Sequence, residues 1–216
     1  RWRLGSLRKR ASELEDVIEQ RTSALRGQTD RLLESDREKS ILVARLKQQS
    51  EDFERLSLED ALTGIGNRRN LDDRLARAFE RALETRLPLS FALFDIDEFK
   101  RINDQYSHSA GDHALVAVAQ ALQEGIAGRG SIARWGGEEF AALFEGMPLE
   151  DARQLCEQLR ERVQAIDCSE FAPGWSMTIS GGVTERTGLS HHEKLVSRAD
   201  ALLYEAKRAG RNRICG

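Results

Sequence analysis

The first quarter of the chain repeats hydrophobic positions at alternating spacings of three and four residues. Eleven of the sixteen positions in this series are apolar, which is the heptad pattern of a coiled-coil seam. At about 1.5 Å per residue, one helix over this stretch would be roughly 80 Å long, too long and too polar to fold back into a globular core. The pattern therefore predicts a partner helix. The series consists of Leu4, Leu7, Ala11, Leu14, Ile18, Arg21, Leu25, Gln28, Leu32, Ser35, Lys39, Leu42, Leu46, Gln49, Phe53 and Leu56.

The middle of this seam is weaker than its ends. Gly27 adds a helix cost of roughly 1 kcal/mol relative to Ala, and five seam positions are polar. Because the seam is continuous and contains no turn signal, it favours a parallel homodimeric coiled coil over residues 1–56 rather than a hairpin. A single surface helix is the alternative, and it would leave the apolar stripe exposed. The polar seam positions are Arg21, Gln28, Ser35, Lys39 and Gln49.

Residues 57–216 have a different texture, in which short apolar runs alternate with amphipathic segments. The pair Gly136-Gly137 separates two of these runs and favours a tight hairpin turn, because both residues can take positive φ. The resulting βαββαβ order predicts an α+β fold with helices around a central mixed or antiparallel sheet. The predicted strands are 89–94, 132–135, 139–144, 176–184 and 212–215, and the predicted helices are 110–127, 149–167 and 192–209.

Charge and cysteine usage exclude several classes of function. Residues 1–56 carry 13 Lys/Arg against 11 Asp/Glu (+2), and residues 57–216 carry 20 against 25 (−5). Neither part has the strongly basic balance of a nucleic-acid-binding domain, so we expect no nucleic-acid partner. The three cysteines are odd in number and show no CxxC or histidine-rich spacing, so they indicate neither a zinc site nor a disulfide framework. A reduced cytoplasmic setting is the simple interpretation.

The first ten residues combine basic side chains with Trp2, a composition typical of a segment just inside a membrane. No run of about eighteen apolar residues occurs in the sequence. We therefore expect a cytoplasmic protein. One interpretation of the basic segment is that the chain is the cytoplasmic portion of an inner-membrane sensor protein. A solvated basic helix end is equally compatible. The basic residues are Arg1, Arg3, Arg8, Lys9 and Arg10.

Two acidic pairs lie where the predicted strands would bring them together. Asp95 and Asp97 end the first strand, and Glu138 and Glu139 follow the glycine pair. If that strand lies beside the hairpin, the carboxylates converge, and such mutually repelling groups usually bind a hard divalent cation such as Mg²⁺ or Mn²⁺. The alternative is that these carboxylates are only solvated loop residues.

A metal site of this kind commonly handles phosphates, which also attract cationic side chains. Lys100 follows the first strand, and Lys207 and Arg211 lie at the end of the last helix. Asn103 and Asp112 could bind a base, because a carboxylate accepts hydrogen bonds from the N1 and N2 donors of guanine. None of these spacings is specific by itself.

Four long motifs follow one another in register within residues 57–216. They are DALTGIGNRR at 60–69, FDIDEFKRIND at 94–104, RWGGEEF at 134–140 and ADALLYEAKRAGRNR at 199–213. Together they resemble the GGDEF-family diguanylate cyclases. The resemblance implies a palm-like, ferredoxin-like βαββαβ domain over residues 57–216. It also implies an enzyme that condenses two GTP into cyclic di-GMP and two pyrophosphate.

The resemblance further implies a role for each matching residue. Two Mg²⁺ or Mn²⁺ ions per GTP half-site would be held by Asp95, the backbone carbonyl of Ile96 and Glu138, with Glu139 a further ligand and Asp95, Glu138 and Glu139 forming the catalytic set. Guanine would be bound by Asn103 and Asp112. The triphosphate would be bound by Lys100, Lys207 and Arg211 with backbone amides near Glu98 and Phe99. Gly136 and Gly137 would leave room for the nucleotide and the turn.

Each such domain would supply half of an active site, so the resemblance implies that catalysis needs a dimer. The coiled coil would provide the high effective concentration of the second copy, under control of an upstream sensor domain in the same full-length chain. The alternative is a degenerate GGDEF domain that binds GTP without catalysis. Against it stands the intact set Asp95, Lys100, Asn103, Asp112, Glu138, Lys207 and Arg211.

Product inhibition is expected to be weak. Many family members carry an RxxD inhibition motif that ends six residues before the first glycine of the signature, and here its two ends are Ala127 and Gly130. No allosteric RxxD site is therefore present. We predict that cyclic di-GMP added during turnover causes little or no inhibition of the initial rate through this primary site. Tight inhibition that survives Arg129→Ala would contradict this expectation.

Overall fold

The computed structural model describes residues 21, 33–34, 36–47, 49–50 and 58–216. Its contacts divide the chain into two units, Arg1–Ser57 and Leu58–Gly216. The described residues of the first unit are helical, and the rest of the predicted coiled coil lies outside the described residues. Within the described part of the chain, no helix is both long enough and apolar enough to cross a membrane.

The described helix of the first unit carries an exposed apolar stripe. The seam positions Leu42 and Leu46 are 58% and 57% exposed, and Leu33, Ile41 and Val43 are also exposed. Apolar side chains of this size lose their hydration cost only when they are covered. The partner helix that the heptad pattern predicts stays a prediction.

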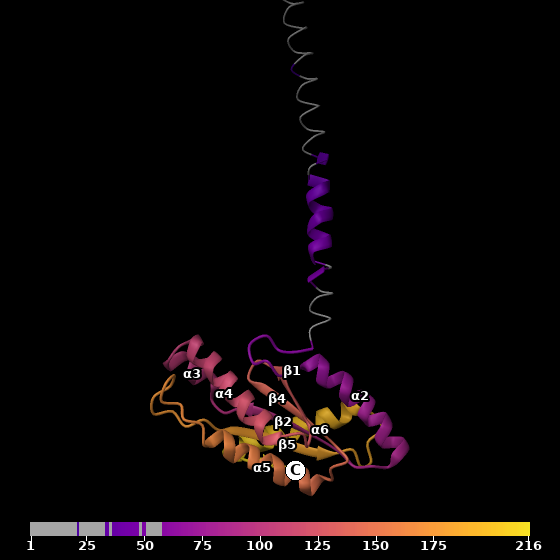
Figure 1. Ribbon diagram of the computed structural model, residues 1–216, viewed down its shortest axis with the longest axis vertical. Helices are drawn as coiled ribbons and strands as arrows, with labels where there is room; N and C mark the ends of the chain where they lie inside the picture. Colours follow the sequence, from indigo (N-terminus) through magenta and orange to yellow (C-terminus); the bar gives the residue numbers. More distant parts are fainter. Residues whose placement is uncertain (1–20, 22–32, 35, 48, 51–57) are drawn as a thin grey trace, which may run out of the picture. The chain divides into compact units, whose positions relative to one another are not determined.

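The second unit is built on a six-stranded mixed sheet with the order β1-β3-β4-β2-β5-β6 (Figure 1). The four inner strands are antiparallel, and the short edge strands β1 and β6 pair in parallel with β3 and β5. The strands are β1 Gly66–Asn67, β2 Leu89–Ile96, β3 Ser131–Gly136, β4 Glu139–Glu145, β5 Ile179–Glu185 and β6 Ile214–Cys215. The helices are α2 Arg68–Thr85, α3 Phe99–Gln105, α4 His108–Ile126, α5 Leu149–Gln164 and α6 His192–Arg208.

Helices cover both faces of this sheet (Figure 1). Because side chains alternate along a strand, Phe94 and Ile96 of β2 pack in the core with α3, α4 and α5. Phe91 and Leu93 pack in the second core with α2 and α6. Every residue of β2 is buried, which explains why this strand is apolar apart from Ser90 and Asp95.

The predicted βαββαβ order is confirmed as β2–α4–β3–β4–α5–β5. The short elements β1 and α3 were not predicted, and two further elements differ from the sequence expectation. The strand predicted to begin at residue 176 begins at Ile179, since Gly174 takes a φ of +81° and the following segment is still turning into the sheet. Helix α2 was not predicted, although its buried residues have helical spacing and Asn67 caps it by accepting from the Asn70 amide at 3.0 Å.

The hairpin between β3 and β4 also differs from the expected glycine turn. Gly136 pairs with Glu139, so the two turn residues are Gly137 and Glu138. Of the glycine pair, only Gly137 has a positive φ, at 49°. The expectation that the turn is Gly136-Gly137 is therefore wrong by one residue, because a register shift between Arg134 and Gly136 displaces it along β3.

Candidate functional site

The end of β2 meets the glycine hairpin, as the acidic pairs led us to expect. Asp95 is the register partner of Glu139 on β4 and of Ser180 on β5. The amide of Ile96 donates a hydrogen bond of 3.3 Å to the backbone carbonyl of Glu138. The sheet thus brings Asp95, Glu138 and Glu139 together at one end of the inner strands β2 and β4, while their roles as metal ligands stay a prediction.

Asp95 is a buried carboxylate paired with a cation from another element. Asp95 is 6% exposed, and Nζ of Lys207 on α6 lies 2.8 Å from Asp95 Oδ2. Burial raises the pKa of Asp95 to about 6; Lys207 opposes that rise, and the negative charges of Glu138 and Glu139 add to it. A predicted metal ligand and a predicted triphosphate-binding lysine are therefore in direct contact.

The expected gathering of three or four carboxylates differs from what the structure describes. Across the described residues, no group of three or more His, Cys, Asp or Glu side chains is gathered closely enough to hold a metal ion. Lys207 instead supplies the positive charge beside Asp95. The available donors are carboxylate and carbonyl oxygens, the ligand type that Mg²⁺ and Mn²⁺ prefer, so the donor set fits a hard divalent ion.

Asp97 does not join Asp95, although the sequence analysis grouped the two. Its carboxylate accepts hydrogen bonds from Thr178 Oγ1 at 2.8 Å, Ser180 Oγ at 2.7 Å and the Asn212 amide at 3.0 Å. This carboxylate is 5% exposed and its oxygens are already occupied. Asp97 is thus part of the scaffold between β2, β5 and the turn after α6.

One of the two residues predicted to bind guanine packs over a glycine that precedes the other in the sequence. Asn103 lies on α3 and Asp112 on α4. A Cβ built on Gly111 would lie 2.1 Å from Asn103 Oδ1 and 3.2 Å from Phe99 Cζ. The Asn103 side chain therefore occupies the space over Gly111, the residue before Asp112 on α4, because residue 111 has no side chain.

Two of the residues predicted near the triphosphate line one cavity. Glu98 and Arg211 both border a cavity of about 590 Å³ between α3 and the turn after α6. Glu98 precedes α3 in a left-handed conformation (φ 58°) and forms an ion pair with Arg101. Lys100 is exposed on α3. The backbone of Phe99 begins the same helix.

The glycine pair borders open space. A Cβ added at Gly136 or Gly137 would meet no atom within 4 Å, and both residues are exposed. Packing within the chain therefore does not demand glycine at residue 136. This agrees with a need for room outside the hairpin, where the resemblance puts the nucleotide.

Arg134 is a site residue to which the sequence analysis gave no role. Its Nε and Nη2 donate to the carbonyl of Gly137 at 2.9 and 2.8 Å. Its Nη1 also donates to Asp60 Oδ1 at 3.2 Å, and Asp60 accepts from the Thr63 amide and hydroxyl at 2.9 and 2.6 Å. The turn of the hairpin is thus tied to the segment that begins the second unit. The sequence signal that could have identified this pair is that Asp60 and Arg134 each begin one of the four motifs.

We predict that this tie contributes stability that depends on pH. Burial alone would raise the pKa of Asp60, but hydrogen bonds from Thr63 and the charge of Arg134 together lower it. The contribution is therefore complete above the ordinary aspartate value of about 4 and is lost as the pH falls through the lowered folded value. Asp60→Asn should reduce the free energy of unfolding at neutral pH, and urea titrations should show the deficit shrinking in acid. Asp73→Asn, an exposed carboxylate on α2, is the control, and a pH-independent deficit would contradict the prediction.

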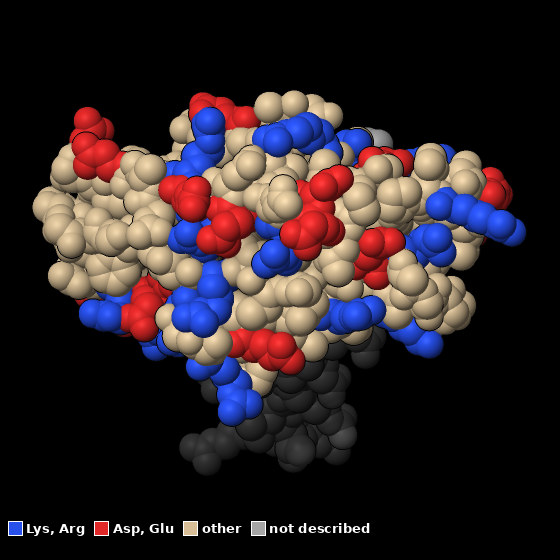
Figure 2. All heavy atoms as spheres, turned by 90° about the horizontal axis from the view of Figure 1, so that it is seen from below, with Lys and Arg blue, Asp and Glu red and all other residues tan. Residues whose placement is uncertain are grey.

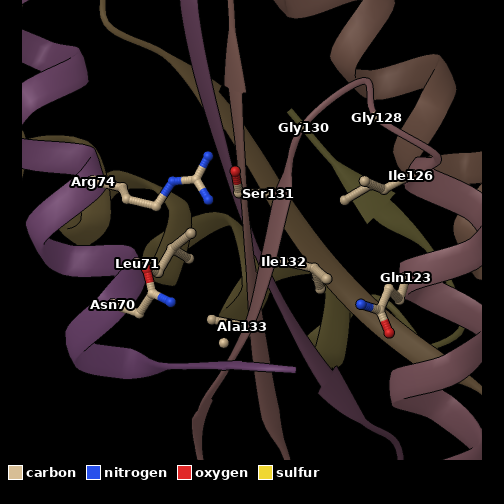
Figure 3. Close-up of a pocket in the computed structure, with 11 residues that line it drawn as sticks. Asn70, Leu71, Arg74, Gln123, Ile126, Gly128, Gly130, Ser131, Ile132 and Ala133 are labelled. Carbon is tan, nitrogen blue, oxygen red and sulfur yellow. The ribbon is translucent and has the colours of Figure 1, made fainter. Parts of the chain in front are cut away.

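The positions of the missing RxxD motif border a second cavity. Gly128 and Gly130 line a space of about 300 Å³ between α2, β3 and the end of α4. Figure 3 shows the Arg74 side chain extending from α2 toward Ser131. None of the residues that line this cavity is acidic, so the carboxylate of the motif has no replacement there.

Comparison with known proteins identifies the family. Residues 57–213 match the family described as "Diguanylate cyclase, GGDEF domain". The diguanylate cyclase DgcP of Pseudomonas aeruginosa is 42% identical over 164 residues, which cover 76% of this chain and 24% of that protein. The diguanylate cyclase VdcA of Vibrio cholerae is 35% identical over 178 residues, covering 81% and 51%. The chain thus spans between 24% and 51% of the length of these relatives.

Solved structures give the same result. The coiled coil and GGDEF domain of DgcB from Caulobacter crescentus, in complex with c-di-GMP, matches with a TM-score of 0.70 and 32% identity, covering 82% of this chain and 95% of that one. The diguanylate cyclase SiaD of Pseudomonas aeruginosa, in complex with its activator SiaC, matches with a TM-score of 0.70 and 30% identity, covering 98% and 83%. On its sequence, its sheet and its signature hairpin, this chain belongs to the GGDEF-domain family of diguanylate cyclases.

Proposed function

We propose that this chain condenses two GTP molecules into cyclic di-GMP with release of two pyrophosphates. The observation that carries the proposal is the meeting of Asp95 with the Gly136-Gly137 hairpin, beside Lys207 at 2.8 Å. Buried negative charge, a cation and open space lie together there. This combination suits a substrate that brings both phosphate and metal.

The proposal assigns the divalent ions to Asp95, the Ile96 carbonyl and Glu138, with Glu139 as a further ligand. When bound, Mg²⁺ or Mn²⁺ would lower the pKa of a ribose 3′-hydroxyl and neutralise charge on the α-phosphate. Lys207 would then be free to leave Asp95 and bind the triphosphate together with Arg211 and Lys100. Asn103 and Asp112 would orient the guanine through its hydrogen-bond donors.

The test is formation of product. Purified protein incubated with GTP and Mg²⁺ should yield cyclic di-GMP, identified by chromatography against an authentic standard. A Glu138→Gln variant should yield none, and wild-type protein with ATP should yield no cyclic dinucleotide. Absence of product from a wild-type protein that binds GTP and dimerises would favour the alternative, a GTP-binding signalling domain without catalysis.

The space over Gly111 offers a specific test of guanine binding. We predict that Gly111→Ala weakens GTP binding about tenfold. The new Cβ would lie 2.1 Å from Asn103 Oδ1 and would therefore displace the Asn103 side chain. The end of a side chain can swing away, so the melting temperature should change little. Calorimetry gives the affinity, and the effect should vanish in an Asn103→Ala background. An equal loss in that background would mean that Asn103 is not the affected group.

We also propose that the working form is a homodimer joined by the N-terminal helices. The exposed stripe that includes Leu42 and Leu46 supports this, since a second copy would cover it. Leu46→Glu should lower both the dimer fraction in light scattering and the specific activity at low protein concentration. Ala44→Glu introduces the same charge off the seam and should change neither. Equal effects of the two variants would contradict a dimer through this seam.

Control by an upstream sensor domain and a cytoplasmic location beside the inner membrane complete the proposal. They are supported by the polar positions within the seam, which make register or splay easy to alter, and by the basic first residues around Trp2. Fluorescence microscopy of the tagged full-length protein tests the location. A uniform cytoplasmic signal would contradict a location beside the inner membrane.

A polymerase palm is a rival of a different class, because it also uses carboxylates to bind metal ions. Such an enzyme needs a basic surface for its template. Figure 2 shows acidic and basic side chains interspersed over one face of the molecule, and residues 57–216 carry a charge of −5 from 20 Lys/Arg and 25 Asp/Glu. Neither observation favours nucleic acid as a partner.

A further inference from the structure

Asp97 forms the most complete polar network next to the candidate site. Its Oδ2 accepts from the Thr178 hydroxyl at 2.8 Å and from the Asn212 amide at 3.0 Å, and its Oδ1 accepts from the Ser180 hydroxyl at 2.7 Å. Its own amide donates to the Thr178 carbonyl at 2.9 Å. The carboxylate therefore joins the end of β2 to β5 and to the turn that follows α6.

That turn has an unusual backbone. Gly210, Arg211 and Asn212 have φ values of 112°, 62° and 47°. Two consecutive non-glycine residues in the left-handed region are strained, and they persist only where the surroundings hold them. The Arg211 amide donates to the Ala206 carbonyl at 3.1 Å, which ends the helix in the manner of a Schellman motif.

Asn212 is held from two sides. Its amide donates to Asp97, while its side chain accepts from Arg160 Nη1 at 2.7 Å and donates to Gln164 Oε1 at 3.2 Å. Arg160 is itself only 9% exposed. Asp97, at the end of β2, thus holds the backbone of Asn212, and residues of α5 hold its side chain.

We propose that Asp97 is a positioning residue that sets the direction of Arg211 toward the phosphates of the bound nucleotide. The inference rests on the proposed function, in which Arg211 binds the triphosphate. Asp97 and Arg211 line the same cavity of about 590 Å³, and the Asn212 amide that donates to Asp97 belongs to the peptide bond between Arg211 and Asn212. The conformation of the turn decides where the guanidinium can reach, and Asp97 holds that conformation.

A purely structural role for Asp97 predicts something different. Loss of a buried acceptor would then lower stability and weaken every nucleotide alike. A positioning role predicts loss for ligands that reach Arg211, which are triphosphates, and little loss for GMP. It also predicts that the loss disappears when Arg211 is already absent.

The first measurement uses the ligand-free protein, so it does not depend on the proposed function. Amide hydrogen exchange at Asn212 should accelerate at least about tenfold in Asp97→Ala, because the amide loses its acceptor. Ser180→Ala is the matched control, since it removes a bond to Oδ1 and leaves the Oδ2 contact with Asn212. Asp97→Ser repeats the measurement if Asp97→Ala does not fold. Unchanged exchange at Asn212 would overturn the inference.

The second measurement is a double-mutant cycle on nucleotide affinity by calorimetry. Asp97→Ala should weaken GTP about tenfold and leave GMP within about twofold, and in an Arg211→Ala background it should weaken GTP no further. Asp97→Asn keeps an acceptor and should restore most of the affinity. Equal losses for GTP and GMP, or a full loss in the Arg211→Ala background, would overturn the positioning role. If the wild type binds no GTP while exchange behaves as expected, the proposed function fails and the structural role of Asp97 at the turn stands.

Discussion

Replacing Asp95 by asparagine is expected to lower the rate of cyclic di-GMP formation by about 10³-fold with little change in stability. The carboxylate is the predicted metal ligand, and an amide cannot supply its charge. Burial, together with the charges of Glu138 and Glu139, already destabilises the ionised form of Asp95 and raises its pKa to about 6. Removing that charge relieves the repulsion, and Lys207, whose side chain is 35% exposed, can turn to solvent.

The measurement pairs initial rates with thermal melting. The melting temperature of Asp95→Asn should stay within roughly 3 °C of the wild type. Glu145→Gln is the matched control, because Glu145 ends β4 as an exposed carboxylate paired with Arg81 at 2.5 Å and should keep full activity. Substantial activity in Asp95→Asn would remove Asp95 from the catalytic set.

The largest expected effect on folding comes from Gly182→Ala, at about 3 kcal/mol. Gly182 lies on β5 beneath α6, and a Cβ there would lie 2.2 Å from the Ala199 carbonyl oxygen and 2.4 Å from the Leu203 amide nitrogen. Both are backbone atoms of a packed helix and cannot move aside alone. Helix α6 would have to shift from the sheet, and it carries Lys207.

Thermal or urea unfolding measures this effect, and the melting temperature should fall by roughly 10 °C. Gly136→Ala provides the control, because no atom lies within 4 Å of its added Cβ and its φ is not in the left-handed region. The melting temperature of Gly136→Ala should equal that of the wild type. A normal melting temperature for Gly182→Ala would mean that α6 does not approach β5 as closely as described.

The fold was largely predictable because its pattern is local. Strand β2 is buried on both faces and is therefore apolar except at Ser90 and Asp95, and the order of strands and helices indicated the βαββαβ unit. The turn of the hairpin was displaced by one residue, since the register shift near Arg134 depends on pairing with β4 and leaves no trace in the glycine pair. Helix α2 could have been found from its own apolar spacing.

The site was predictable only in part. The motifs identified its residues, and strand order brought Asp95 to the hairpin. Asp97 was grouped with Asp95 because both lie at the end of the first predicted strand, and hydrogen bonds from Thr178, Ser180 and the Asn212 amide, all far along the chain, separate their roles. The contact of Lys207 with Asp95 and the tie from Arg134 to Asp60 likewise join distant elements, which spacing cannot reveal.

We propose a cyclase whose active site is completed by two copies of the chain, and a mixing experiment tests this proposal most directly. Wild-type protein is allowed to exchange subunits with increasing shares of Asp95→Asn at constant total concentration, and cyclic di-GMP formation is followed. If each copy supplies half of the site, activity follows the fraction of wild-type homodimers, about one quarter of the full rate in an equal mixture. A rate of about one half, linear in the wild-type share, would show that each copy works alone and would contradict the account.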